Sequence, residues 1–152
     1  MKIIGSLRFL IFLLAFLGIG ALGGGGVLMV SPNGQLMGMP LSLLDQSPFK
    51  DFEIPGIVLF ITLGVVPCLL IFALLKKPEC RFAEMLNGFK DMHWAWTYSI
   101  YIAFVLIVWI QLEMVFLQAV SWLHVFYTFF ALLILFITLL PTVRNLYKKS
   151  IL

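Results

Sequence analysis

Four long apolar runs divide this chain, and they constrain its fold more than any other feature of the sequence. They cover residues 7–30, 54–75, 94–117 and 121–141. Each is long enough for an α-helix to cross the hydrocarbon core of a bilayer, which takes about 20 mostly apolar residues. The chain is 62% hydrophobic and only 11% charged, whereas a water-soluble domain is about 25% charged. We therefore predict a single all-α domain over residues 1–152, a polytopic membrane four-helix bundle.

The basic residues predict how these helices are oriented. Nine of the ten lie before or at the very start of the first run, between residues 76 and 93, or after the last run, and the tenth is Lys50. Loops rich in Lys and Arg usually stay in the cytoplasm. Both termini, starting with Lys2, and the 76–93 loop are therefore predicted to be cytoplasmic, and residues 31–53 form a cap loop on the outer side. No continuous basic face exists, so nucleic acid is excluded as a partner.

The first run could be mistaken for a cleaved signal peptide, because a basic start precedes its apolar residues. It extends to Val30 without an obvious small-x-small cleavage site. We therefore expect it to be retained as a membrane helix.

The cap loop is patterned like a folded segment rather than a free coil. It opens with the turn sequence Ser31-Pro32-Asn33-Gly34, and Pro40 precedes a leucine-rich stretch that favours a short helix. Its many apolar side chains predict that it folds back over the helix ends. The loop also carries three carboxylates, Asp45, Asp51 and Glu53. Carboxylates could bind a cation, but the spacing of these three matches no known metal site. We therefore expect them to form a solvated surface.

The cap loop and the start of the second run also carry a distinctive sequence motif. Its parts are Ser31-Pro32-Asn33-Gly34, Gly38-Met39-Pro40, Ser47-Pro48-Phe49, Asp51-Phe52 and Ile54-Pro55-Gly56. In this motif the chain resembles a group of small, functionally uncharacterised bacterial four-helix inner-membrane proteins. The likeness covers residues 31–64 and is looser around Trp109, Ile110, Gln111 and Glu113. The resemblance implies a bacterial inner-membrane location and brings no reaction or catalytic residue with it.

Glu113 and His124 are ionisable residues inside the third and fourth runs. Such residues are costly within a span and usually face the bundle interior with a partner. The connection between these runs covers only residues 118–120, so they form an antiparallel hairpin that places both side chains at the same depth. With Gln111 they form a candidate polar site. Its function would be a proton relay or ligand polarisation, and the alternatives are a structural hydrogen bond that pins the hairpin or simple exposure at the outer membrane interface.

Small and helix-breaking residues predict how the helices pack. Gly20 and Gly24 form a GxxxG pair that allows close helix approach, and Gln118 could donate a hydrogen bond to a neighbouring helix. Pro67 should kink the second helix, because proline lacks an amide hydrogen. The glycines at 23–26 could instead break the outer end of the first helix where it lines a cavity.

The sequence motifs exclude more functions than they support. The chain has no phosphate-binding loop, nucleophile elbow, HExxH or dinucleotide fingerprint, so it is predicted not to be an enzyme, with no catalytic residue, metal or cofactor. The leading hypothesis is an accessory or structural subunit that packs against other membrane protein subunits or itself. One alternative is an oligomeric small transporter or channel that uses the Glu113/His124 site. A second is a lipid- or quinone-linked membrane enzyme with the cap loop as its lid.

Overall fold

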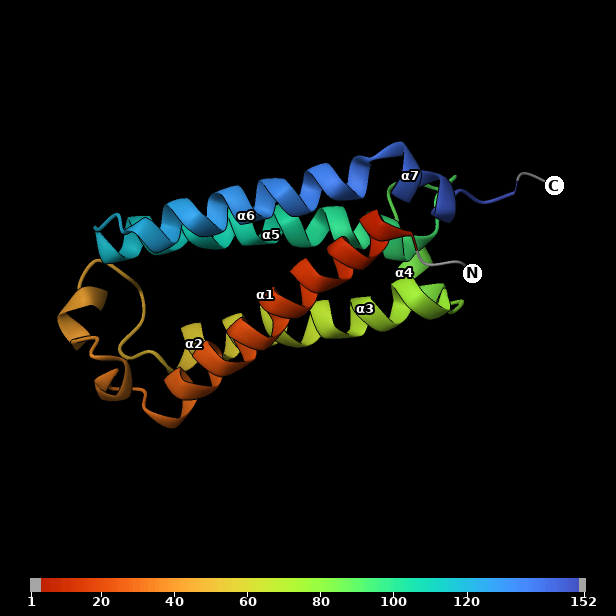
Figure 1. Ribbon diagram of the computed structural model, residues 1–152. Coiled ribbons are helices and arrows are strands. Elements are labelled where there is room, and N and C mark those ends of the chain that lie inside the picture. The colour runs from red at the N-terminus through yellow and green to blue at the C-terminus, as the bar shows by residue number, and fades with distance from the viewer. Residues whose placement is uncertain (1–3, 151–152) are drawn as a thin grey trace.

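The computed structural model describes residues 4–150, and within this range the chain is all-helical (Figure 1). Four helical stretches are long and apolar enough to cross a membrane: α1 (Gly5–Val30), the continuous helix formed by α2, η3 and α3 (Glu53–Lys76), α5 (Trp94–Leu117) and α6 (Trp122–Leu139). The prediction of four membrane-length helices is therefore confirmed, and each end lies close to its predicted residue. Lys2, which contributed to the predicted orientation, lies outside the described residues.

Shorter elements fill the connections. α6 ends at Leu139 rather than at the predicted residue 141, because Pro141 has no amide hydrogen to donate and begins the next helix. α5 ends where Gln118 adopts a left-handed conformation with φ 48°, and Ser121 caps the start of α6. The short elements are η1 (Gln35–Met37), η2 (Leu41–Leu44), α4 (Arg81–Met85), α7 (Pro141–Arg144) and η4 (Asn145–Tyr147).

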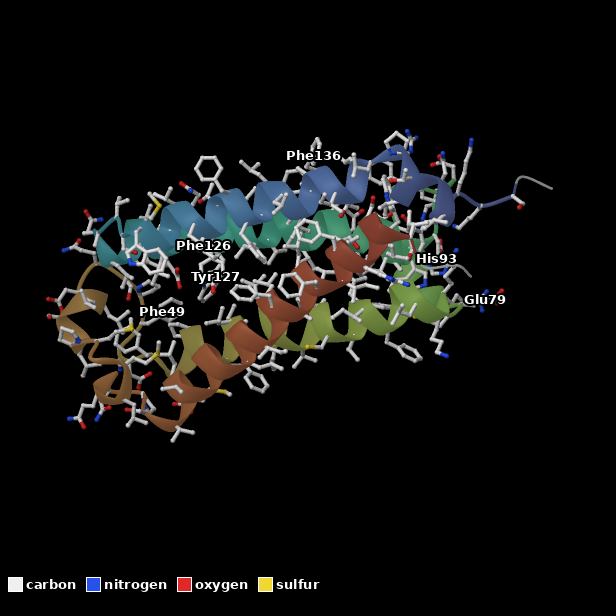
Figure 2. All side chains as sticks on the ribbon, viewed as in Figure 1. Phe49, Glu79, His93, Phe126, Tyr127 and Phe136 are labelled. Atoms are coloured by element: carbon white, nitrogen blue, oxygen red, sulfur yellow. The ribbon has the colours of Figure 1, made fainter. Side chains whose placement is uncertain are left out.

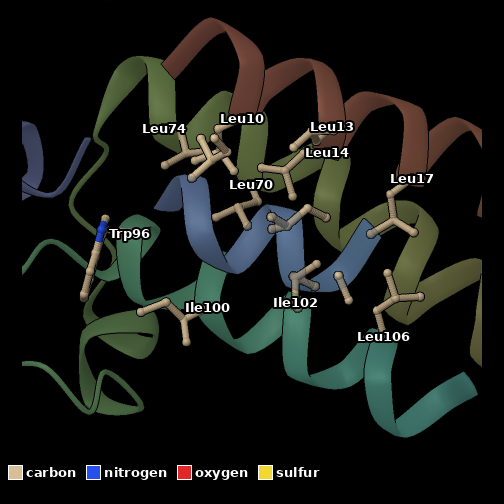
Figure 3. Close-up of a cluster of buried hydrophobic side chains, with 14 of the residues drawn as sticks. Leu10, Leu13, Leu14, Leu17, Leu70, Leu74, Trp96, Ile100, Ile102 and Leu106 are labelled. Carbon is tan, nitrogen blue, oxygen red and sulfur yellow. The ribbon is translucent and has the colours of Figure 1, made fainter. Parts of the chain in front are cut away.

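The long helices are arranged as two pairs. α1 packs along α2, η3 and α3, and α5 packs along α6. The pairs lie close together at the end that carries α7 and diverge towards the end that carries η1 and η2 (Figure 1). The close end is filled by a cluster of buried apolar side chains, shown in Figure 3, that includes Leu10, Leu14, Leu70, Leu74, Ile102 and Leu106. Apolar packing therefore joins the two pairs at one end of the bundle.

The closest approach between α1 and its neighbour occurs at glycines other than the predicted pair. A Cβ added at Gly25 would lie 2.7 Å from the carbonyl oxygen of Gly56, and one at Gly18 would lie 3.3 Å from the carbonyl oxygen of Gly64. At Gly20 and Gly24 the nearest atom would be 3.8 Å away, an ordinary contact. The prediction that Gly20 and Gly24 mediate close packing is therefore corrected, because they lie on a different face of α1.

Pro67 is the second residue of α3, at a junction between helical segments. It is buried near the start of α3 (Val66–Lys76), directly after the π-helical segment η3 (Phe60–Val65), which follows α2 (Glu53–Leu59). A proline ring clashes with the carbonyl four residues earlier, here that of Leu63. The carbonyl of Leu63 lies in η3, where the π-helical hydrogen bonds join residues five apart instead of four. The structure therefore shows a π-helical segment next to Pro67, and the kink stays a prediction.

The cap loop packs onto the helix ends. Asn33 organises its first turn by accepting hydrogen bonds from the Ser31 hydroxyl at 2.7 Å and the Gln35 amide at 3.1 Å. Phe52 and Leu44 are buried against Leu28 of α1. The ring of Phe49 meets the ring of Phe116 edge to face, with centroids 6.0 Å apart, which attaches the loop to α5. Other residues of the loop that join these contacts are Met39 and Leu43.

A polar network closes the opposite end. Lys149 and Glu84 form an ion pair at 2.7 Å, and the Tyr147 hydroxyl donates to the carbonyl of Leu74 at 2.7 Å. Burial alone would raise the pKa of the Glu84 carboxyl, but hydrogen bonds from Lys149, Asn87 and the backbone of Trp94 together hold this pKa below its usual value. These contacts attach the C-terminal segment to the end of α3 and to residues 84–90.

Candidate functional site

Glu113 and His124 lie opposite each other across the α5–α6 hairpin. The short connection places Glu113 near the end of α5 and His124 in the first turn of α6. His124 Nε2 lies 3.8 Å from Glu113 Oε2, and the His124 side chain is 9% exposed while that of Glu113 is 32% exposed. The structure thus brings these two side chains next to each other, but the distance between the two atoms is too long for a direct hydrogen bond.

Both side chains are also hydrogen-bonded within the protein. Trp109 Nε1 donates to Glu113 Oε1 at 2.7 Å, and the backbone amide of Ser121 donates to His124 Nδ1 at 3.0 Å. Because Nδ1 accepts a hydrogen bond, the imidazole carries its proton on Nε2. The site therefore presents an acceptor, Glu113 Oε2, beside a donor, the Nε2–H group of His124.

A cavity of about 560 Å³ opens in front of this pair. It lies between α1 and η3 on one side and α5 and α6 on the other, beneath the cap loop. Tyr127 reaches from α6 towards α1 at its edge, as Figure 2 shows. Most of the lining is apolar, and the side chains that contribute polar groups are Trp109, Glu113, Ser121, His124 and Tyr127.

A second cavity of about 200 Å³ lies between α2 and α5 and is lined by the cap-loop residues Leu44, Phe49 and Phe52. It shares Trp109 and Glu113 with the larger cavity. The hydrogen-bonded Trp109–Glu113 pair therefore forms part of the wall of both cavities.

Several predicted site residues lie elsewhere. Gln111 is exposed on the surface of α5 and lines neither cavity. The prediction that it belongs to the polar site is therefore corrected. Gln118 donates to the Val115 carbonyl of its own helix at 2.6 Å rather than to a neighbouring helix. Gly20 and Gly24, predicted as packing residues, line the larger cavity instead.

The acidic residues of the cap loop have separate surroundings. Asp45 and Glu53 are exposed, and Asp51 accepts a hydrogen bond at 3.0 Å from the Glu53 amide at the start of α2. Within residues 4–150, no three His, Cys, Asp or Glu side chains are grouped in a way that could hold a metal ion.

Trp109 and Tyr127 belong to the site but were not predicted as site residues. Both were detectable, because Trp109 is four residues before Glu113 and Tyr127 is three residues after His124. Residues at these spacings lie on one helix face.

These features define an α-helical chain with four membrane-length helices and a polar site within its apolar interior. Comparison of the chain with models of protein families, with curated proteins and with solved structures finds no match.

Proposed function

We propose that this chain is a membrane protein that binds a lipophilic molecule inside the bilayer, without a chemical step of its own. The observation that carries the proposal is the cavity of about 560 Å³ with the Glu113–His124 pair in its wall. Small-molecule sites commonly have roughly 300–1,000 Å³, mostly apolar walls and a few polar groups that orient the ligand. The cavity has each of these features.

The borders of the two cavities support entry of the ligand from the bilayer. Leu123 at the edge of the larger cavity and Leu112 at the edge of the smaller one are each 44% exposed on the side of the bundle. The cap loop packs over the end of the cavities that would face water. A lipophile dissolved in the bilayer would therefore reach the site without crossing an aqueous phase.

Native mass spectrometry of the chain, purified in a mild detergent and released from its micelle, tests the proposed function. The expected spectrum contains the chain with a noncovalent adduct whose mass is that of a membrane lipophile. A spectrum of the bare chain alone, from a preparation whose helical circular dichroism is intact, would contradict the proposal.

We also propose that the membrane is the bacterial inner membrane, with both termini inside and the cap loop outside. The distribution of basic residues supports this orientation. The ion pair between Lys149 and Glu84 is consistent with the C-terminal segment and the 76–93 loop lying on the same side. A Gln46→Cys variant in intact cells is expected to react with a membrane-impermeant maleimide, because Gln46 is exposed in the cap loop. The native Cys80 is the internal control and should stay unlabelled. Labelling of Cys80 alone would show that the orientation is the opposite of the one proposed.

A second candidate function is that of an accessory subunit that associates with its own copies. Gln111 supports it, because this polar side chain lies in an otherwise apolar exposed row of α5 with Phe104, Val108 and Val115. It lies six residues before the end of α5, about 9 Å inside the helix end at 1.5 Å per residue. An amide both donates and accepts, so two copies of Gln111 can satisfy each other across a two-fold axis.

Substituting Gln111→Leu is expected to lower the dimer fraction in liposomes, because the loss of two hydrogen bonds of about 1 kcal/mol each weakens the dimerisation constant roughly 30-fold. Single-molecule photobleaching measures that fraction directly. The matched control is Gln46→Leu in the exposed cap loop, which should leave it unchanged. Equal dimer fractions in the two variants would count against self-association through α5.

A further inference from the structure

We infer that the polar site selects a long-chain alcohol over other lipophiles of the same length. This inference rests on the proposed function, that a lipophile occupies the larger cavity, and adds the chemical class of the ligand. It is carried by the geometry of the Glu113–His124 pair and by the placement of apolar residues around it.

The pair offers one acceptor and one donor to a ligand. The other hydrogen-bonding atom of each side chain is already used, Glu113 Oε1 by Trp109 and His124 Nδ1 by the backbone of Ser121. Glu113 Oε2 and His124 Nε2 remain, and both residues line the larger cavity. Their separation of 3.8 Å is too long for a good hydrogen bond between them. It does suit a single oxygen atom that lies about 2.8 Å from each.

A hydroxyl group matches this arrangement, because its oxygen donates one hydrogen bond and accepts others. It can donate to Glu113 Oε2 and accept from the Nε2–H group of His124. An ether or a ketone only accepts, so it leaves the Glu113 oxygen without a donor. A fatty-acid carboxylate also only accepts, so it too leaves the oxygen of Glu113, the only acidic side chain in the cavity wall, without a donor.

The rest of the cavity indicates a long tail. From the polar pair the lining continues to Leu17, Leu63 and Leu106, which are buried near the middle of α1, η3 and α5. Towards the other end it is closed by apolar cap-loop side chains. A ligand with its hydroxyl at Glu113 would therefore place an alkyl or isoprenoid chain along the bundle towards the centre of the bilayer.

Competition against tritiated 1-hexadecanol bound to the purified chain in detergent tests this inference. The competitors are 1-hexadecanol, its methyl ether, hexadecane and hexadecanoate, which have equal chain lengths and different polar ends. The alcohol is expected to displace the label at a concentration roughly tenfold lower than any of the others, as the loss of one hydrogen bond predicts.

The Glu113→Gln variant sharpens the test. The amide can still accept from Trp109, but it offers the ligand a donor where the carboxylate offered an acceptor. The alcohol is then expected to compete no better than its methyl ether. The matched control is Glu53→Gln, the same substitution at an exposed carboxylate outside both cavities, which should keep the tenfold preference.

The outcomes separate the inference from the proposed function. Displacement by hexadecane or hexadecanoate as effective as that by hexadecanol would overturn the alcohol assignment and leave lipophile binding in place. A tenfold preference that survives in Glu113→Gln would also overturn it, because the selecting group would then lie elsewhere. Failure of the folded chain to bind any of these probes above its detergent background would contradict both.

Discussion

Replacing Gly25 with alanine is expected to destabilise the folded chain by about 2 kcal/mol, the usual cost of forcing one extra methyl into a tightly packed contact. The added Cβ would lie 2.7 Å from the carbonyl oxygen of Gly56 and 2.8 Å from the amide nitrogen of Phe60. Both are backbone atoms, so no side chain can move aside, and α1 must shift away from α2. Thermal unfolding in detergent, followed by circular dichroism, should show a lower transition temperature.

Gly23 provides the matched control for this substitution. It lies on the same helix but is exposed, and nothing lies within 4 Å of a Cβ built at this position. Alanine is a better helix former than glycine by up to about 1 kcal/mol, so Gly23→Ala should be neutral or slightly stabilising. Equal transition temperatures for the two variants would show that α1 and α2 are less closely packed than the structure indicates.

The four membrane-length helices were predictable because hydropathy depends on composition along the chain and not on tertiary contacts. The neighbouring levels of Glu113 and His124 followed in the same way from the three-residue connection at 118–120. Antiparallel helices joined by so short a loop must align residues equally distant from it. The proximity of Glu113 and His124 therefore follows from the short stretch of chain that separates them.

The packing glycines were not predicted correctly, because a GxxxG pair says nothing about which helix face is covered. The buried row of α1 contains Leu14, Gly18, Ala21, Gly25 and Leu28, spaced by four and three residues. Gly18 and Gly25 of this row allow the approach to η3 and α2, whereas Gly20 and Gly24 border the larger cavity. The glycines at 18 and 25 could have been found by following this spacing instead of the motif.

The position of Gln111 follows from helix geometry. It is two residues from Glu113, and at about 100° per residue the two side chains point to nearly opposite sides of α5. Only one of them can face the cavity. The sequence identifies both as polar residues within a span, but the choice between them depends on how α5 is rotated against its neighbours, which is set by packing.

Substituting Gly20→Phe is expected to reduce lipophile binding by the chain at least about tenfold, the scale on which a ligand loses affinity when its pocket is filled. Gly20 lines the larger cavity, and a Cβ at this position would lie 3.8 Å from the Tyr127 hydroxyl oxygen. No backbone atom blocks the new side chain, so the ring can enter the space that the tail of the ligand would use. Native mass spectrometry should then show mainly the bare chain.

Gly23→Phe is the control that separates filling of the cavity from the presence of a new aromatic ring on α1. Gly23 is exposed, does not line either cavity and has open space around its Cβ position. A phenylalanine there should lie on the exposed surface, as Phe12 and Phe16 of the same helix do, and the ligand should be retained. If both variants keep the ligand with normal thermal stability, the lipophile is bound outside the cavity, and the proposed function loses the observation on which it stands.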